Sequence, residues 1–326
     1  MKSHLSLIVC TFNNCDLLRS CLNCLRDQYL DSKHSFEVLV VDNNSTDTTK
    51  QVVTSFIQDG LIPSLKYIFE PKTGLTNARL AGLSHSTSDW IAFIDDDVRI
   101  KEDWVSSVLA FVQDHPKSGV VSGKIHPEYL GTPSTAALKC EAALCRVDYG
   151  TQEIHFKPES PAIRFAGAAI VFQKQALLEI GWLEKQYLTD RVGKALSSGG
   201  DTEIILRIKN KGWEIWYTPT LYAVHLIPST RTTIEYLCRL HRGIACTSAQ
   251  LDAIGMEGKV PLRHQLKNLA LALAFTARRI GAWTFHDLLL RRHLGDKRLV
   301  QIFEGIGRVE SCISFFLNPL DVKDLS

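Results

Sequence analysis

Three consecutive aspartates, Asp95, Asp96 and Asp97, follow the apolar run at residues 90–94. Carboxylates this close repel one another unless a cation joins them. Hard oxygen ligands at this density suit Mg²⁺ or Mn²⁺, which bind few protein carboxylates and keep coordination sites for the oxygens of a substrate diphosphate. The row therefore predicts a divalent metal and nucleotide-linked chemistry. The alternative is an acidic turn that caps the helix expected from about Glu102, which would need only one aspartate.

The elements that must position this row alternate in type along the first half of the chain. Apolar runs predict strands at residues 5–10, 36–41, 65–69 and 90–94, with helices between them. Asn13 or Asn14 is placed to cap the first of these helices. The alternation predicts an α/β fold with a doubly wound, mostly parallel sheet. Ligands bind beyond the carboxyl ends of such strands, and Thr11, Asp42 and Asp95 all fall at these ends.

Several short segments follow one another along the chain: 9–13 (Val-Cys-Thr-Phe-Asn), 41–47 (Val-Asp-Asn-Asn-Ser-Thr-Asp), 74–79 (Gly-Leu-Thr-Asn-Ala-Arg), 95–97, 167–169 (Gly-Ala-Ala), 199–203 (Gly-Gly-Asp-Thr-Glu) and His225. In this order they resemble the inverting glycosyltransferases of family 2, and the resemblance covers roughly residues 5 to 245. Members of that family have the GT-A fold, which is Rossmann-like, and use nucleotide-diphosphate sugars. The resemblance therefore implies a GT-A glycosyltransferase.

The resemblance also implies roles for residues on the nucleotide side. It places Thr11 and Asp42 at the base, Arg79 at the base or phosphate, and Asp95 at the ribose or donor sugar. The residues expected to bind the nucleotide are Thr11, Phe12, Asn13, Asp42, Asn44, Arg79, Asp95 and Asp96.

On the side of the chemistry, the resemblance makes Asp97, with His225, the ligand of Mn²⁺ or Mg²⁺ and makes Asp201 the general base. A bound metal stabilises the negative charge that develops on the leaving diphosphate. A positioned carboxylate takes the proton of the attacking hydroxyl, and one such step inverts the configuration of the sugar. Glu203 is a reserve candidate for the base, because Gly200 stands where the family has an acidic residue.

Two further departures from the family pattern concern the substrates. Asn43 replaces the usual second aspartate of the base-binding turn, which leaves the donor open between a UDP-sugar, the first choice, and a dTDP-sugar. The Gln-x-x-Arg-Trp element of processive members does not follow His225. We therefore expect a hexosyltransferase that adds a single sugar to a hydroxyl acceptor, in surface polysaccharide or lipid-linked glycan assembly.

From about Thr232 the pattern becomes helical, which predicts a GT-A nucleotide-sugar-binding and catalytic domain at 1–230 and a basic helical region at 231–326. Residues 259–309 hold ten lysines and arginines against three acidic residues, interleaved with leucines and aromatics. This pattern predicts amphipathic helices that lie on an anionic membrane surface, where a lipid-linked acceptor would be found. The alternative of equal weight is a helical bundle that covers the sheet or forms a homodimer.

Composition narrows the remaining classes. The formal net charge of +2, from 37 basic and 35 acidic residues among 326, does not indicate nucleic-acid binding. Nine cysteines in no regular framework, and a start that runs straight into a strand, predict a cytoplasmic protein. The basic helices at 259–309 would place it at the inner face of the membrane. The apolar stretch at 269–277 is shorter than the roughly 20 residues that cross a bilayer.

Two other functions are alternatives to a glycosyltransferase. A sugar nucleotidyltransferase is disfavoured, because it would carry a glycine-rich basic loop after its first strand, whereas residues 11–14 contain neither a glycine nor a basic residue. A catalytically silent nucleotide-sugar binding module that scaffolds a membrane assembly is kept open by Gly200.

Overall fold

The computed structural model describes residues 4–30, 34–62, 64–157, 160, 163, 165–192, 196–257, 260–289 and 295–320. The chain divides into two compact units. The first comprises Met1–Glu128, Cys145–Lys185 and Lys211–Leu226, and the second comprises Tyr129–Leu144, Gln186–Asn210 and Ile227–Ser326. The domain boundary expected near residue 230 stays a prediction.

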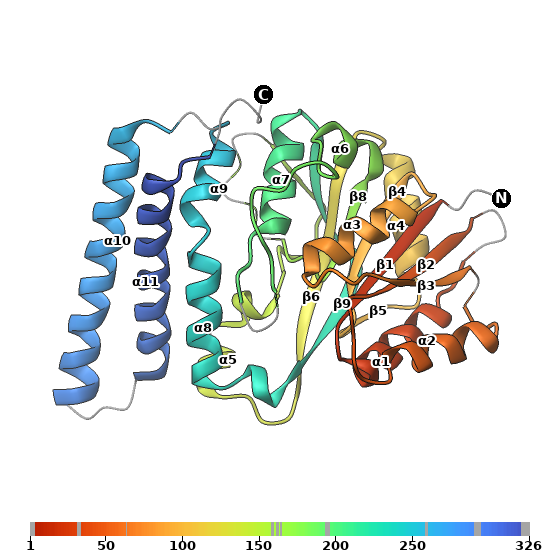
Figure 1. The fold of residues 1–326 in the computed structure, drawn as a ribbon, viewed down its shortest axis with the longest axis horizontal. Coiled ribbons are helices and arrows are strands. Elements are labelled where there is room, and N and C mark those ends of the chain that lie inside the picture. Colours follow the sequence, from red (N-terminus) through yellow and green to blue (C-terminus); the bar gives the residue numbers. More distant parts are fainter. Residues whose placement is uncertain are drawn as a thin grey trace. The chain divides into compact units, whose positions relative to one another are not determined.

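The first unit is built on one sheet (Figure 1). Its parallel part joins β1 (Leu5–Thr11) to β2 (Phe36–Asp42) and β4 (Trp90–Asp95), and β2 to β3 (Leu65–Phe69). Its antiparallel part contains β5 (Val98–Ile100), β6 (Ser118–Leu130), β7 (Ile154–Phe156), β8 (Ala169–Gln173) and β9 (Glu214–Pro228). Among the described residues the strand order is β3-β2-β1-β4-β8-β6-β9-β5, and β7 pairs with β9.

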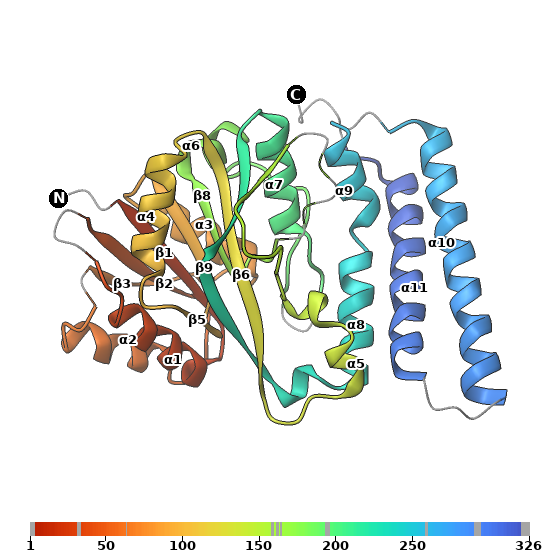
Figure 2. The ribbon, with the colours of Figure 1, turned by 180° about the vertical axis from the view of Figure 1, so that it is seen from behind.

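Helices cover both faces of this sheet. They are α1 (Cys15–Arg26), α2 (Thr49–Gln58), α3 (Leu75–His85), α4 (Trp104–Asp114) and α6 (Lys174–Glu179). Figures 1 and 2 show α3 and α4 on opposite faces. Gly82 lets α3 approach β1, because a Cβ at this position would lie 2.3 Å from Ile8 Cγ2. With helices on both faces the strands are buried on both sides, which explains their continuous apolar runs.

The predicted α/β fold is confirmed, and the four predicted strands coincide with β1 to β4 to within one residue at each end. Asn14 is the N-cap residue of α1 and one of the two residues expected there, but its side chain makes no capping bond. Instead, one oxygen of Asp47 accepts from the backbone N of Cys15 at 3.1 Å and the other from the backbone N of Thr49 at 3.0 Å, so a single carboxylate serves the first turns of α1 and α2.

The second unit is helical, as predicted for the C-terminal region. Its elements are α5 (Thr135–Leu138), α7 (Gly200–Asn210), α8 (Ile234–Ala245), α9 (Ser248–Gly255), α10 (Leu262–Trp283) and α11 (Gly295–Leu317), with short 3₁₀ turns at Glu141–Leu144 and Ser229–Arg231 and a π-helical turn at Thr284–Leu289. Within this unit, α11 lies between α8 and α10 (Figures 1 and 2). None of the helices in the described ranges is long and apolar enough to cross a membrane.

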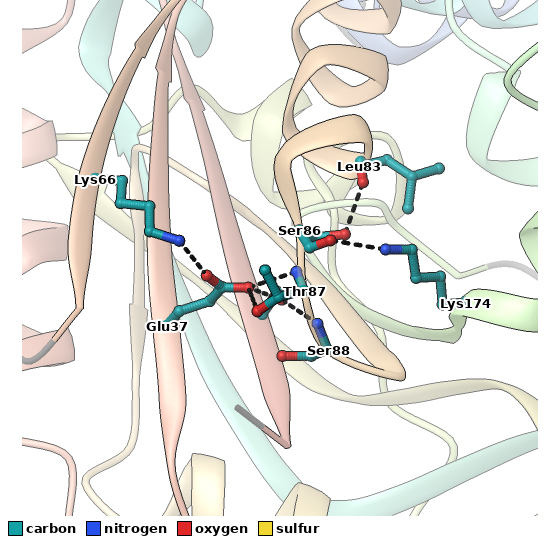
Figure 3. Close-up of polar contacts among 8 residues, drawn as sticks. Glu37, Lys66, Leu83, Ser86, Thr87, Ser88 and Lys174 are labelled. Atoms are coloured by element: carbon teal, nitrogen blue, oxygen red, sulfur yellow. Dashed lines mark hydrogen bonds and ion pairs between the residues drawn. The ribbon is translucent and has the colours of Figure 1, made fainter. Parts of the chain in front are cut away.

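A buried carboxylate on β2 ties the parallel strands to the loop that enters β4 (Figure 3). Glu37 accepts hydrogen bonds from Ser6 Oγ at 2.6 Å, Lys66 Nζ at 2.9 Å, and the backbone N and Oγ1 of Thr87 at 2.7 and 2.8 Å. Burial alone would raise the pKa of Glu37, but these donors from Ser6, Lys66 and Thr87 lower it to about 2. The ionised carboxylate is therefore the form that the fold requires.

Replacing Glu37 by Gln should lower the free energy of unfolding near neutral pH by about 2 kcal/mol, because the amide loses the charge-assisted bonds from Lys66 and Thr87. The folded-state pKa, about 2, lies below the ordinary value of 4.5. The contribution of the carboxylate is thus present above the ordinary value and is lost as pH falls from there toward the folded value.

Chemical denaturation of the unmodified chain and of Glu37→Gln over this range of pH checks the prediction, with exposed Glu102→Gln as the matched control. A difference between the unmodified chain and Glu37→Gln that stays the same at every pH would contradict it.

Candidate functional site

The first of the three aspartates, Asp95, ends β4 and lies beside a buried arginine, Arg79. Asp95 Oδ1 lies 3.8 Å from Arg79 Nη2 of α3, and 32% of the Asp95 side chain is exposed. Arg79 is only 2% exposed; it donates to the Gly167 carbonyl at 3.3 Å and lies over the ring of Phe93. Arg79 therefore orients Asp95, whose carboxylate reaches solvent.

The second aspartate faces inward. Asp96 is buried, and its Oδ1 accepts from Asn14 Nδ2, in the loop after β1, at 2.8 Å. Burial, together with the neighbouring Asp97 carboxylate, raises the pKa of Asp96 to about 7. In the same region, the carbonyl of Thr11, at the end of β1, accepts from the backbone N of Asn43 at 2.9 Å.

The third aspartate meets a histidine from a strand far along the chain. β5 and β9 pair antiparallel with Val98 opposite His225, and the carbonyl of Asp97 accepts from the backbone N of Leu226 at 2.8 Å. This pairing places Asp97 Oδ1 3.2 Å from His225 Nε2, with both side chains buried. Burial alone would lower the pKa of His225, but the Asp97 carboxylate and the Cys145 thiol raise it well above its usual range.

The spacing of Asp97 and His225 fits a divalent metal. Adjacent ligands on an octahedral ion with bonds of about 2.1 Å lie about 3.0 Å apart, close to the distance between these two donor atoms. In the described part of the chain, no group of three or more His, Cys, Asp or Glu residues could hold a metal ion. A metal bound by this pair would displace the proton of His225 and would take diphosphate oxygens and water in its remaining sites.

The other predicted nucleotide residues lie in the loops after β1 and β2. Asn13 Oδ1 accepts from the backbone N of Thr46 at 2.7 Å, which joins the two loops. Both Asn13 (φ +51°) and Asn44 (φ +67°) adopt the left-handed conformation that asparagine tolerates. Asn44 and Phe12 are exposed, with Phe12 at 45%. The two loops therefore present a polar surface with one exposed aromatic ring at the carboxyl ends of the strands.

Asp42 differs from its neighbours in facing the interior. Its side chain is buried; Oδ1 accepts from the backbone N of Ser45 at 2.8 Å and Oδ2 from Tyr67 OH at 2.7 Å. Asn43, the departure from the family pattern, accepts from the backbone N of Gly74 and donates to the carbonyl of Lys72. These two side chains shape the loops, and the first unit brings them together with Thr11, Arg79 and the aspartate row.

Both predicted bases lie in the first turn of α7, in the second unit. Glu203 is almost completely buried, and its carboxylate accepts from the backbone N of Tyr187 and Leu188 and pairs with Arg207 at 2.8 Å. Burial raises the pKa of Glu203, although these hydrogen bonds and the Arg207 charge oppose the rise. Asp201, by contrast, is partly exposed.

The structure explains why position 200 is a glycine, which the sequence alone did not. Its backbone N donates to Asp190 Oδ1 at 2.9 Å, and a Cβ at this position would lie 2.2 Å from Asp190 Oδ2. Asp190 is buried, so its carboxylate fills the space that a side chain at 200 would need. Asp190 lies ten residues earlier in the chain, and no local pattern marks it.

A comparison with protein families adds to this geometry. Residues 6–180, more than half of the chain, match the model of glycosyl transferase family 2. The pre-mycofactocin glycosyltransferase of Mycobacterium tuberculosis is 25% identical over 221 residues, which are 68% of this chain and 42% of that relative. The chain thus spans less than half the length of this curated relative. The succinoglycan biosynthesis protein ExoM of Rhizobium meliloti is 23% identical over 273 residues, 82% of this chain and 80% of that one.

Solved structures share the fold. The mannosyltransferase PcManGT from Pyrobaculum calidifontis, in complex with GDP-Man and Mn²⁺, aligns with a TM-score of 0.60 at 18% identity and covers 95% of this chain and 88% of its own. TarS 1–349 from S. aureus, in complex with UDP, aligns with a TM-score of 0.52 at 18% identity, over 97% of this chain and 92% of its own. The predicted GT-A fold and the predicted family are both confirmed: the chain belongs to glycosyl transferase family 2.

Proposed function

We propose that the chain transfers a single hexose from a nucleotide-diphosphate sugar to a hydroxyl acceptor, with inversion and with Mn²⁺ or Mg²⁺. The observation that carries the proposal is the aspartate row of a family 2 chain, with Asp97 beside His225 at the spacing of two ligands of one ion. The complexes of PcManGT with GDP-Man and Mn²⁺ and of TarS with UDP support a nucleotide-diphosphate donor. We keep a UDP-sugar as the first choice and a dTDP-sugar as the second.

On the donor side, the exposed predicted residues would contact the nucleotide sugar, and the buried ones would hold the exposed ones in place. Phe12, Asn13 and Asn44 are exposed and Asp95 is partly exposed, so these members would touch the nucleotide or the sugar. Asp42 and Arg79 are buried and already bonded within the fold, so they would act by holding the base-binding loop and Asp95 in place. When bound between Asp97 and His225, the metal would neutralise the charge of the diphosphate.

On the acceptor side, the hydrogen-bond partners favour Asp201 over Glu203 as the base. A base must accept a proton from the attacking hydroxyl. The Glu203 carboxylate already accepts two backbone amides and an arginine, and it holds residues 187–188 against α7. Asp201 lies in the first turn of α7, which begins at Gly200. It would take the proton as the acceptor oxygen attacks the anomeric carbon from the side opposite the diphosphate.

The acceptor class is proposed from one relative. ExoM is named for succinoglycan biosynthesis and aligns over most of both chains. This supports an acceptor in polysaccharide assembly. A lipid-linked acceptor at the inner face of a membrane is part of the proposal. The alternative of a silent binding module, which Gly200 keeps open, is separated from the enzyme by the test below.

The proposal is tested by release of nucleoside diphosphate from a panel of UDP-, dTDP- and GDP-sugars, with and without Mn²⁺ or Mg²⁺ and with simple glycan acceptors. We expect one metal-dependent donor. For that donor, Asp201→Asn should reduce turnover about 100-fold or more, the usual size of a general-base contribution, while donor binding persists.

Asp16→Asn, on an acidic residue in the first turn of α1, is the matched control and should keep full turnover. Undiminished turnover in Asp201→Asn would remove Asp201 from the mechanism. Donor binding without turnover in the unmodified chain, across the whole panel, would favour the silent module.

The contact between Gly200 and Asp190 generates a separate prediction. Gly200→Ala should destabilise the chain by about 2 kcal/mol, because the new methyl group collides with the Asp190 carboxylate. In an Asp190→Ala background this cost should vanish, so that thermal or chemical unfolding of the four chains yields a coupling of similar size.

Gly255→Ala, in α9 of the same unit, is the control, since its nearest side-chain atoms lie at an ordinary 3.9 Å. Equal costs of Gly200→Ala in both backgrounds would show that Asp190 does not occupy this space.

A further inference from the structure

Helix α10 has two unlike faces. One packs on α11 and includes the buried Ala272. The other is an exposed apolar stripe whose members recur every three or four residues: Leu262, Leu266, Ala270, Leu273, Ala277 and Ile280. The large side chains of this stripe are 45–58% exposed. Residues at this spacing lie on one side of a helix, so they form a single continuous surface.

A second stripe runs beside the first. Arg263, Lys267 and Arg278 are exposed. Each is the next residue after a member of the apolar stripe (262, 266 and 277), so the three lie beside it on the helix. No Asp or Glu occurs anywhere between residues 262 and 283. The outward surface of α10 is therefore apolar along one side, and along the other it carries these three cations with the exposed Leu271 and Ala274 between them. We call the two stripes together the outer face of α10.

The other basic residues of 259–309 have different surroundings. Lys297 is exposed, but it lies on α11. Arg298 pairs with Asp287 at 3.0 Å and Arg308 with Glu304 at 2.7 Å. Arg279 lies over the ring of Phe275. Lys259, Arg291 and Arg292 lie outside the described residues. Within the described ranges, the exposed cations that remain on α10 are those beside the apolar stripe, so charge and apolar area coincide on one face.

We propose that the outer face of α10 docks on the surface of an anionic membrane. Exposed leucines of an amphipathic helix enter the boundary between headgroups and acyl chains, and basic residues beside them bind acidic headgroups. The helix would lie flat, with its inner face held by α11. The two alternatives from the sequence, a bundle and a membrane surface, thus apply to opposite faces of one helix.

Charge complementarity decides against a second copy of the chain as the occupant. In a symmetric dimer the same patch meets itself. Two outer faces in contact would bring Arg263 and Lys267 against Arg278, or against themselves, with no acidic residue on the helix to pair with them. An anionic lipid surface offers the missing negative charge together with an apolar layer.

The test is sedimentation of the full chain with vesicles of phosphatidylcholine, alone or mixed with phosphatidylserine, at low and high salt. We expect binding to the mixed vesicles at low salt and loss of binding at high salt. The triple variant Arg263→Gln, Lys267→Gln, Arg278→Gln should weaken binding about 100-fold, from about fivefold per basic residue. Leu266→Gln with Leu273→Gln should weaken it by about tenfold per leucine.

The matched controls are Leu138→Gln, an equally exposed leucine on α5, and Lys211→Gln, an exposed lysine outside the helix. Both should bind as the unmodified chain does. The substituted side chains are exposed, so thermal unfolding should be unchanged in every variant.

Three results would overturn the proposal: no binding to the mixed vesicles at low salt, binding by the α10 variants equal to that of the controls, or a fall in molecular mass in solution when Leu266 and Leu273 are replaced. The last would identify a second copy as the occupant. The readout is binding, so the outcome does not depend on whether the chain transfers a sugar.

Discussion

Three adjacent carboxylates at the end of one strand are tolerable only if each finds a partner of its own, and this constraint organises the first unit. Arg79 comes from α3, Asn14 from the loop after β1, and His225 from β9, so the aspartates at residues 95–97 tie together elements that are far apart in sequence. A buried charge left without its partner is costly, so loss of one element should disturb the whole row. Of the three carboxylates, that of Asp95 also reaches solvent.

Much of the fold could be predicted because local pattern and tertiary structure agree. The parallel strands are buried on both faces, so their apolar runs appear directly in the sequence, and the polar residues after them mark the ligand edge of the sheet. What could not be predicted depends on partners distant in sequence. The pairing of β5 with β9, which puts His225 beside Asp97, leaves no local signal, and only the resemblance to the family linked these two residues. Asp190, which explains Gly200, was marked neither by a local pattern nor by the resemblance.

Some acidic side chains of this protein stabilise the fold and others are available to a substrate, and their hydrogen-bond partners distinguish the two groups. Glu37 and Glu203 are buried and satisfied by several donors, so they hold the structure together. Asp95 and Asp201 are partly exposed in segments that resemble functional elements of the family. The motif at residues 199–203 contains a group of each kind, the support Glu203 and the candidate base Asp201. Burial and hydrogen-bond partners separate the supports from the groups that can meet a substrate.

The role of the aspartate row is tested most directly by calorimetric titration of the full chain with UDP, in the presence and absence of Mn²⁺. The account predicts that Mn²⁺ strengthens binding in the unmodified chain and in Asp59→Ala, which removes an exposed carboxylate at the end of α2. In Asp97→Ala the metal-dependent part of the affinity should disappear, with thermal unfolding recorded to show that the variant is folded. Metal-dependent binding that is unchanged in Asp97→Ala would contradict the account.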